Sequence, residues 1–204
     1  MAYSDFTQAK LEASFGLSFS QTSSLIAGVE AIATSDYLQQ TMQRNLPLAT
    51  AINTEKIRSE LLIAPILVEL KTLFPSISFF SGTEFNVDAA QGLNGYCDFL
   101  ISRDPDQLNI KAPVAIIFEA KREDLNAAIP QCAAAMVAAQ RFNQNHGIER
   151  GSIYGAVTTG SVWRFLKLEG EHVTLDLNEV YLNPLGQLMG SLVVLLQLEP
   201  LAIA

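Results

Sequence analysis

The amino-acid sequence predicts an α/β protein, a single domain in which a mixed central sheet is flanked by helices and preceded by a helical extension. Three observations predict this fold class. A helix-period apolar pattern begins near residue 54, three short apolar segments bounded by turn residues follow it, and a helix rich in small residues then precedes further strand-like segments. The length of 204 residues fits one domain of ordinary size.

Residues 1–52 are predicted to form the helical extension, packed on a main domain of residues 53–204. Asp5 is expected to cap a first helix that carries Leu11 and Phe15. Ser35 is expected to open a second helix, because a serine at this position can accept a hydrogen bond from the first turn.

The helix that starts the main domain is the strongest one in the pattern. Thr54 is a suitable N-cap, and Glu55 lies favourably near the positive end of the helix. Pro65 is expected to bend this helix. The apolar positions at helical spacing are Ile57, Leu61, Leu62, Ile66, Leu67 and Leu70.

The remaining elements are predicted from short apolar runs and from the turn residues that separate them. Strands are predicted over 77–87, 95–102 and 114–120, and then a helix over 130–145, whose alanines allow close packing on a sheet. Thr158-Thr-Gly-Ser suits the turn of a hairpin between two further strands. The two strands of the hairpin are predicted over 152–157 and 162–168. A third strand is predicted over 173–177 and a terminal helix over 185–196.

Composition and charge exclude several classes of protein. The hydrophobic fraction of 49% excludes a mainly disordered chain, and the net charge of −8 has the wrong sign for coating nucleic acid by charge alone. The start of the chain lacks a signal-peptide pattern and there are only two cysteines, which predicts a cytoplasmic protein. No membrane span is expected, and the scattered cysteines and histidines do not suit a zinc site.

An acid and a base stand at the end of a predicted apolar strand. Glu119 and Lys121 lie two positions apart, so the strand period places them on one face. Asp98 interrupts the preceding strand, and an antiparallel hairpin would bring it beside Glu119. Two neighbouring carboxylates need a cation, and two carboxylates with a backbone carbonyl and waters suit Mg²⁺ or Mn²⁺. A surface ion pair at the strand end is the alternative interpretation.

These residues resemble a known superfamily, the PD-(D/E)XK or restriction-endonuclease-like nucleases. Asp98 followed by Glu119-Ala120-Lys121 looks like the D…ExK motif of that superfamily. The stretch from Ser59-Glu60 looks like the first core helix of the nuclease domains of type I restriction subunits. The chain also resembles a group of small uncharacterised bacterial proteins of this superfamily. Gln131 and the turn Thr158-Thr-Gly-Ser-Val-Trp resemble further elements of those domains.

The resemblance covers about residues 53–168 and implies a restriction-endonuclease-like core with candidate catalytic residues. It implies that Asp98, Glu119 and the Ala120 carbonyl bind Mg²⁺ or Mn²⁺, that Glu60 supplies a further acid for a water or a second ion, and that Gln131 lies near the site. Lys121 is expected to position the attacking water and to stabilise charge. Cys97 stands where the superfamily's name has proline.

The function that the resemblance implies is metal-dependent hydrolysis of nucleic acid, with DNA favoured over RNA. Seven basic residues in the core segments are available for a local positive face: Arg103, Lys111, Lys121, Arg122, Arg141, Arg164 and Lys167. The alternative is a catalytically silent nuclease fold that serves as a binding or assembly module. A protein partner that supplies DNA binding is a further expectation, as is a homodimer formed through the apolar C-terminal helix and residues 199–204.

Overall fold

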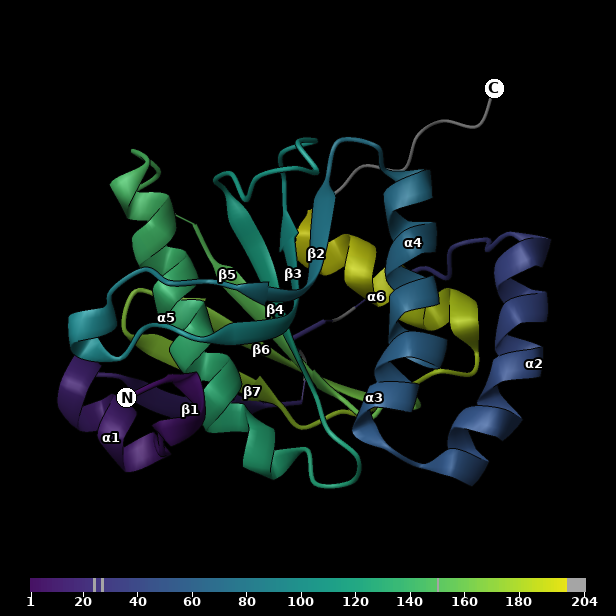
Figure 1. Ribbon diagram of the computed structural model, residues 1–204, viewed down its shortest axis with the longest axis horizontal. Helices are drawn as coiled ribbons and strands as arrows, with labels where there is room; N and C mark the ends of the chain where they lie inside the picture. Colours follow the sequence, from purple (N-terminus) through teal and green to yellow (C-terminus); the bar gives the residue numbers. More distant parts are fainter. Residues whose placement is uncertain (24, 27, 150, 198–204) are drawn as a thin grey trace.

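The computed structural model of the chain describes residues 1–23, 25–26, 28–149 and 151–197. Within them the fold is α/β, with an eight-stranded mixed sheet flanked by helices, as predicted (Figure 1). The strand order is β1-β7-β6-β5-β4-β3-β2, and β8 pairs with β6. The strands are β1 (Ser18–Thr22), β2 (Ser78–Glu84), β3 (Tyr96–Ser102), β4 (Val114–Ala120), β5 (Ile153–Thr158), β6 (Val162–Glu169), β7 (His172–Asp176) and β8 (Val180–Tyr181).

The helices cover both faces of the sheet. They are α1 (Gln8–Phe15), α2 (Asp36–Ile52), α3 (Glu55–Arg58), α4 (Ala64–Leu73), α5 (Ile129–Asn145) and α6 (Leu185–Leu196). One core lies between the sheet and the helices α2, α4 and α6, and a second core lies between the sheet and α5 together with the N-terminal residues. Figure 1 shows α5 on one side of the sheet and α4 on the other.

Pairing within the sheet explains its mixed character. The strands β2, β3 and β4 are consecutive antiparallel neighbours, whereas β4 and β5 run parallel and are joined by a crossover that contains α5. The predicted hairpin is present, because β5 and β6 pair antiparallel from Ile153 opposite Leu168 to Thr158 opposite Trp163.

The approach of α5 to the sheet depends on small residues. Its alanines are fully or almost fully buried, and Gly155 on β5 lies beneath it. A Cβ atom at position 155 would lie 2.5 Å from Met136 Sδ and 2.8 Å from Cys132 Sγ. Both cysteines are free and buried, which fits their expected role as small apolar residues.

The N-terminal stretch contains more than helices. The two predicted helices are present, but the first is capped by the Thr7 side chain and not by Asp5. Ser35 caps the second helix through its side chain, as expected. Residues 18–22 form the edge strand β1, which pairs parallel with β7 and was not predicted.

The helix at the start of the main domain is interrupted before Pro65. Thr54 is its N-cap, as predicted, but a π-helical segment, Ser59–Ile63, separates α3 from α4. The proline stands in the first turn of α4, where its missing N–H group costs least. On the neighbouring helix, Asn45 Nδ2 donates to the Leu61 carbonyl of the π-helical segment at 2.8 Å.

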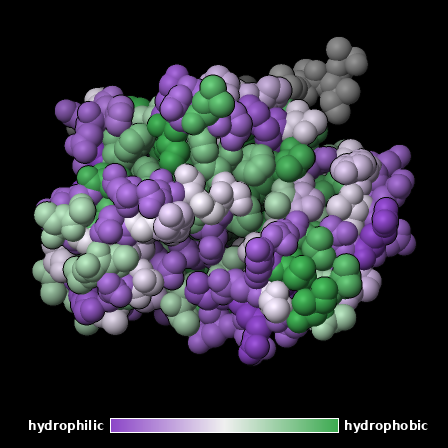
Figure 2. Space-filling view, in the orientation of Figure 1, coloured by the Kyte–Doolittle hydropathy of each residue, from purple (hydrophilic) through white to green (hydrophobic). Residues whose placement is uncertain are grey.

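No helix among the described residues is long and apolar enough to cross a membrane. Figure 2 shows a surface in which hydrophilic residues surround smaller hydrophobic groups, one of them at the lower right, near α3.

Candidate functional site

The hairpin of β3 and β4 brings two carboxylates together. Phe99 pairs with Phe118 in this antiparallel ladder, so the next position places Asp98 beside Glu119. The Asp98 Oδ2 atom accepts a hydrogen bond from the Ala120 backbone N–H at 2.7 Å. The expected neighbourhood of the two acids is therefore a consequence of strand register.

Glu119 is the most constrained member of the site. Its side chain has no exposed surface, and its Oε2 atom accepts a hydrogen bond from Gln131 Nε2 at 2.7 Å. The other carboxylate oxygen, Oε1, is buried and has no hydrogen-bond partner within the described residues. A buried acceptor that stays unpaired costs free energy, so this atom marks a position where a donor or a cation would be stabilising.

The pKa of Glu119 is raised well above its ordinary value. Burial is the main cause, and the nearby negative charge of Asp98 adds to it. The ammonium of Lys121 acts in the opposite direction, whereas a hydrogen bond with Asp98, which forms when Glu119 is protonated, and then the charge of Glu55 raise the pKa further. The site therefore holds a carboxyl group whose charged form needs compensation.

Lys121 is fixed at the end of β4 by its backbone and by its ammonium group. The Lys121 N–H donates to the Thr158 carbonyl at 2.8 Å, which ties the strand end to the β5–β6 hairpin. Its Nζ atom donates to the Ala120 carbonyl at 3.0 Å and lies 4.0 Å from Glu119 Oε2. The ammonium thus lies beside two of the groups that the resemblance implies as metal ligands.

A groove of about 310 Å³ opens beside Asp98. The start of the helical segment lines one side of it through Glu55, Ser59 and Glu60, and the β2 edge contributes Ser81. Asp98, unlike the fully buried Glu119, is reached from this groove, which is therefore the entrance to the site.

The structure places Glu60 at the groove and not against Glu119. Its carboxylate lies 3.9 Å from Lys56 Nζ, and its side chain is 55% exposed. Glu55 is the acid on this helix whose charge influences Glu119, and sequence reasoning had given Glu55 only a role at the helix end. The sequence signal that indicates Glu55 is its position directly after the N-cap Thr54 and one turn before Ser59.

The oxygen atoms of the site define what it could hold. Asp98, Glu119 and the Ala120 carbonyl offer oxygen ligands only, which is the donor type that Mg²⁺ prefers. Among the described residues, no group of three or more His, Cys, Asp or Glu side chains is arranged to hold a metal ion. A cation here would rest on two carboxylates, a carbonyl and water.

Two further residues connect the elements around the site. Trp163 is fully buried, and its Nε1 atom donates to the Gly160 carbonyl at 3.1 Å. Arg58 donates to the Thr159 carbonyl at 2.9 Å and to Ser161 Oγ at 3.0 Å. These contacts join α3 to the β5–β6 hairpin and so hold the two sides of the site together.

Comparisons of the chain with protein-family models, with curated proteins and with solved structures find no match.

Proposed function

We propose that the protein is a metal-dependent nuclease with a restriction-endonuclease-like core. The observation that carries the proposal is the buried carboxylate of Glu119, whose Oε1 atom lacks a partner while Asp98, Lys121 and Gln131 surround it. A buried charge of this kind is costly unless it is compensated, and such groups cluster at functional sites.

The order of elements supports the proposed core. A helix precedes three antiparallel strands, α5 follows, and β5 then joins the sheet parallel to β4. This is the order that the resemblance implies for residues 53–168. The acid-bearing strand β4 lies near the middle of the sheet, where its neighbours on both sides hold its end in place.

The chemistry assigned to the site is hydrolysis of a phosphodiester bond. Mg²⁺ or Mn²⁺, when bound, would neutralise phosphate charge and lower the pKa of a bound water. Asp98, Glu119 and the Ala120 carbonyl are the residues that would hold it. Gln131 orients the Glu119 carboxylate through its hydrogen bond at 2.7 Å.

In this proposal Lys121 positions the attacking water and stabilises charge. Its ammonium already donates to the Ala120 carbonyl and faces Glu119, so it presents hydrogen-bond donors to the same atoms that a metal would contact. Donors fixed where negative charge develops are among the strongest contributors to catalysis.

The charges of the protein favour a partner that supplies nucleic-acid binding. Six of the seven basic residues expected to form a positive face are paired with acids: Lys111 with Asp106, Lys121 with Glu119, Arg122 with Glu123, Arg141 with Asp88, Arg164 with Glu179 and Lys167 with Glu169. Paired cations release few counterions on binding a phosphate backbone. We therefore propose a second protein as the source of affinity, and DNA remains the substrate that the resemblance favours. The predicted homodimer surface consists of the C-terminal helix and residues 199–204. Most apolar side chains of that helix, α6, are buried in the core and are not available for such a surface. Residues 199–204 lie outside the described residues.

One observation favours a catalytically silent binding module as the second candidate. The described residues place only two carboxylates at the site and no group of three metal-binding side chains. A nuclease fold that has lost its catalytic metal would serve as an assembly or recognition domain.

The experiment is cleavage of labelled duplex, single-stranded and branched DNA and of RNA with Mg²⁺ or Mn²⁺. Lys121→Gln tests the site, and Lys167→Gln is a matched control because Lys167 is a partly exposed lysine on β6 paired with Glu169. We expect cutting that EDTA and Lys121→Gln abolish and that Lys167→Gln retains. A folded wild type that cuts none of these substrates would overturn the catalytic proposal in favour of the silent module.

A further inference from the structure

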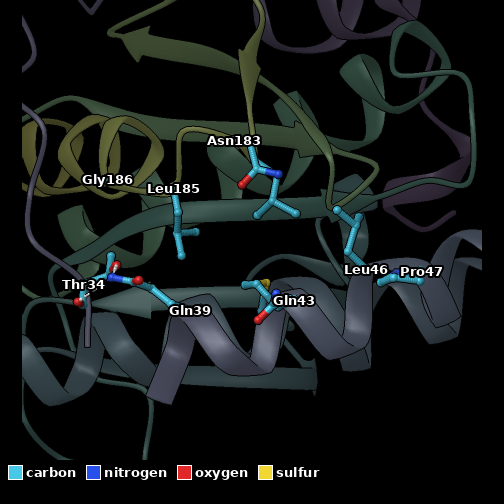
Figure 3. Close-up of a pocket in the computed structure, with 10 residues that line it drawn as sticks. Thr34, Gln39, Gln43, Leu46, Pro47, Asn183, Leu185 and Gly186 are labelled. Carbon is cyan, nitrogen blue, oxygen red and sulfur yellow. Dashed lines mark hydrogen bonds between the residues drawn. The ribbon is translucent and has the colours of Figure 1, made fainter. Parts of the chain in front are cut away.

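A second hollow of the described structure lies away from the candidate nuclease site. It has a volume of about 550 Å³ and is formed between α2 and the segment that joins β8 to α6. Figure 3 shows Gln43 and Leu46 on α2 along one wall, and Asn183 and Leu185 along the opposite wall. This volume lies within the range of about 300–1,000 Å³ that is typical of small-molecule sites.

The lining of this cavity carries no formal charge. None of its ten described lining residues is acidic, basic or a histidine. Its apolar part includes Met42 and Leu182, which are almost fully buried, and the partly buried Leu46 and Leu185. Because a charged ligand would find no partner here, the cavity suits an uncharged compound with an apolar face.

Two carboxamides open into the cavity without partners. Gln39 at one end is already occupied, since its Nε2 atom donates to the Thr34 carbonyl at 3.2 Å and lies 3.3 Å from Thr34 Oγ1. The side chains of Gln43 and Asn183, both of them exposed, form no hydrogen bond within the described part of the chain, and they stand on opposite walls. Each offers a donor and an acceptor side by side, which is complementary to a ligand edge that also carries both.

We propose that this cavity binds a nucleobase, with adenine the best fit. An aromatic base is flat, uncharged and apolar on its faces, so it can lie against Met42 and Leu46. A carboxamide pairs with adenine through its N6 and N7 atoms in one bidentate contact. The base reaches the cavity either as a free nucleoside or as part of a nucleic-acid strand, and the binding site does not depend on the proposed catalytic function.

The α2 helix connects this cavity to the groove beside Asp98. Asn45 follows Gln43 along α2 and donates to the Leu61 carbonyl, in the π-helical segment that also contains Glu60. A ligand bound to Gln43 would therefore contact the same helix that donates a hydrogen bond, through Asn45, to the π-helical segment.

The test is titration of the full chain with adenosine, guanosine, cytidine and uridine, observed by ligand-detected NMR and by chemical shifts of the protein. We expect saturable binding with adenosine strongest, and a loss of roughly five- to tenfold in affinity for Gln43→Leu and Asn183→Leu. Gln40→Leu is the matched control, because Gln40 is an exposed glutamine of α2 that does not line the cavity.

A short single-stranded oligoadenylate separates the two sources of the base. A base within a strand is supported if the oligonucleotide binds more tightly than adenosine and Gln43→Leu weakens both. A free nucleoside is supported if only adenosine responds to that change. Absence of saturable binding by all probes, or binding that neither Gln43→Leu nor Asn183→Leu weakens, would overturn the proposal. Activity of the candidate nuclease site plays no part in this readout, so the two proposals fail separately.

Discussion

The end of β4 and the cavity beside α2 differ in the charge of the groups that form them. At the strand end, a carboxylate with no exposed surface is held beside a second acid and an ammonium, and its pKa is raised. In the cavity no lining residue among those described is charged, and two carboxamides remain open. At the strand end, charged groups are buried at a free-energy cost, in a position where a reaction could use their charge. The cavity is lined by neutral groups, whose burial costs little free energy and which can form hydrogen bonds. The proposed site of reaction and the proposed site of neutral recognition therefore differ in charge.

The largest expected effect tests whether chemistry is confined to the strand end. Asp98→Asn keeps an oxygen acceptor for the Ala120 N–H but removes a charge, so the fold is retained while cleavage falls at least about 100-fold. Gln43→Leu in the cavity is the comparison and retains the rate of cleavage of a short duplex, as measured in single turnovers with the protein at a saturating concentration, where weaker binding does not affect the rate. Equal losses from both changes would contradict the separation.

The second prediction concerns stability and pH at Glu119. Because burial raises the pKa of Glu119 in the folded state, its neutral form is the stable one. This contribution is complete below the unfolded pKa of about 4.3 and is lost as the pH rises toward the folded pKa, at up to about 1.4 kcal/mol per pH unit. Glu119→Gln removes this dependence and makes the protein more stable at neutral pH.

Urea unfolding from pH 4 to pH 8 checks this result. Glu60→Gln is the control, because its carboxylate is mostly exposed and its removal leaves the slope in place. A wild-type free energy of unfolding that stays level across this range would contradict the burial argument.

The sequence predicts the strand end well because its geometry is local. Two positions on one strand share a face, and a hairpin offset places Asp98 opposite Glu119, so both relations follow from periodicity and register. Gln131 lies on the next helix in the chain. The contact of Lys121 N–H with Thr158 could not be predicted, since it depends on which strand becomes the parallel neighbour of β4.

Other parts of the molecule have no comparable signal in the sequence. The cavity forms where α2 meets a segment from the far end of the chain, so its volume depends on packing between distant elements. Strand β1 is short and partly polar, so its own residues do not predict a strand. It is extended where it pairs with the edge of β7. Pro65 predicts a bend in the helix, but nothing in the sequence predicts the π-helical turn that precedes it, whose Leu61 carbonyl accepts a hydrogen bond from Asn45.

A third prediction tests the connection between the two regions. Asn45→Ala leaves the Leu61 carbonyl without its side-chain donor, which should lower the free energy of unfolding by about 1 kcal/mol. Gln40→Ala on the same helix is the control, because that side chain makes no contact of this kind within the described residues. Chemical denaturation measures both, and an Asn45→Ala protein as stable as the control would show that α2 does not support the π-helical segment.

The smallest expected effect identifies which glutamate of the helical segment belongs to the site. The Lys56–Glu60 pair spans 3.9 Å between exposed side chains, so Glu60→Gln should change the free energy of unfolding by at most about 0.5 kcal/mol. The charge of Glu55 raises the pKa of Glu119, and Glu55→Gln should therefore lower that pKa, whereas Glu60→Gln should leave it in place. Carboxyl ¹³C chemical shifts of Glu119 across a pH titration resolve the two variants. If Glu60→Gln alone shifts the pKa of Glu119, the third acid of the site is Glu60, as the sequence resemblance implies. If Glu55→Gln alone shifts that pKa, the third acid is Glu55, which lies closer to the N-cap. The distance in the folded chain decides between them, because electrostatic influence falls with distance and does not follow the place of a residue in a motif.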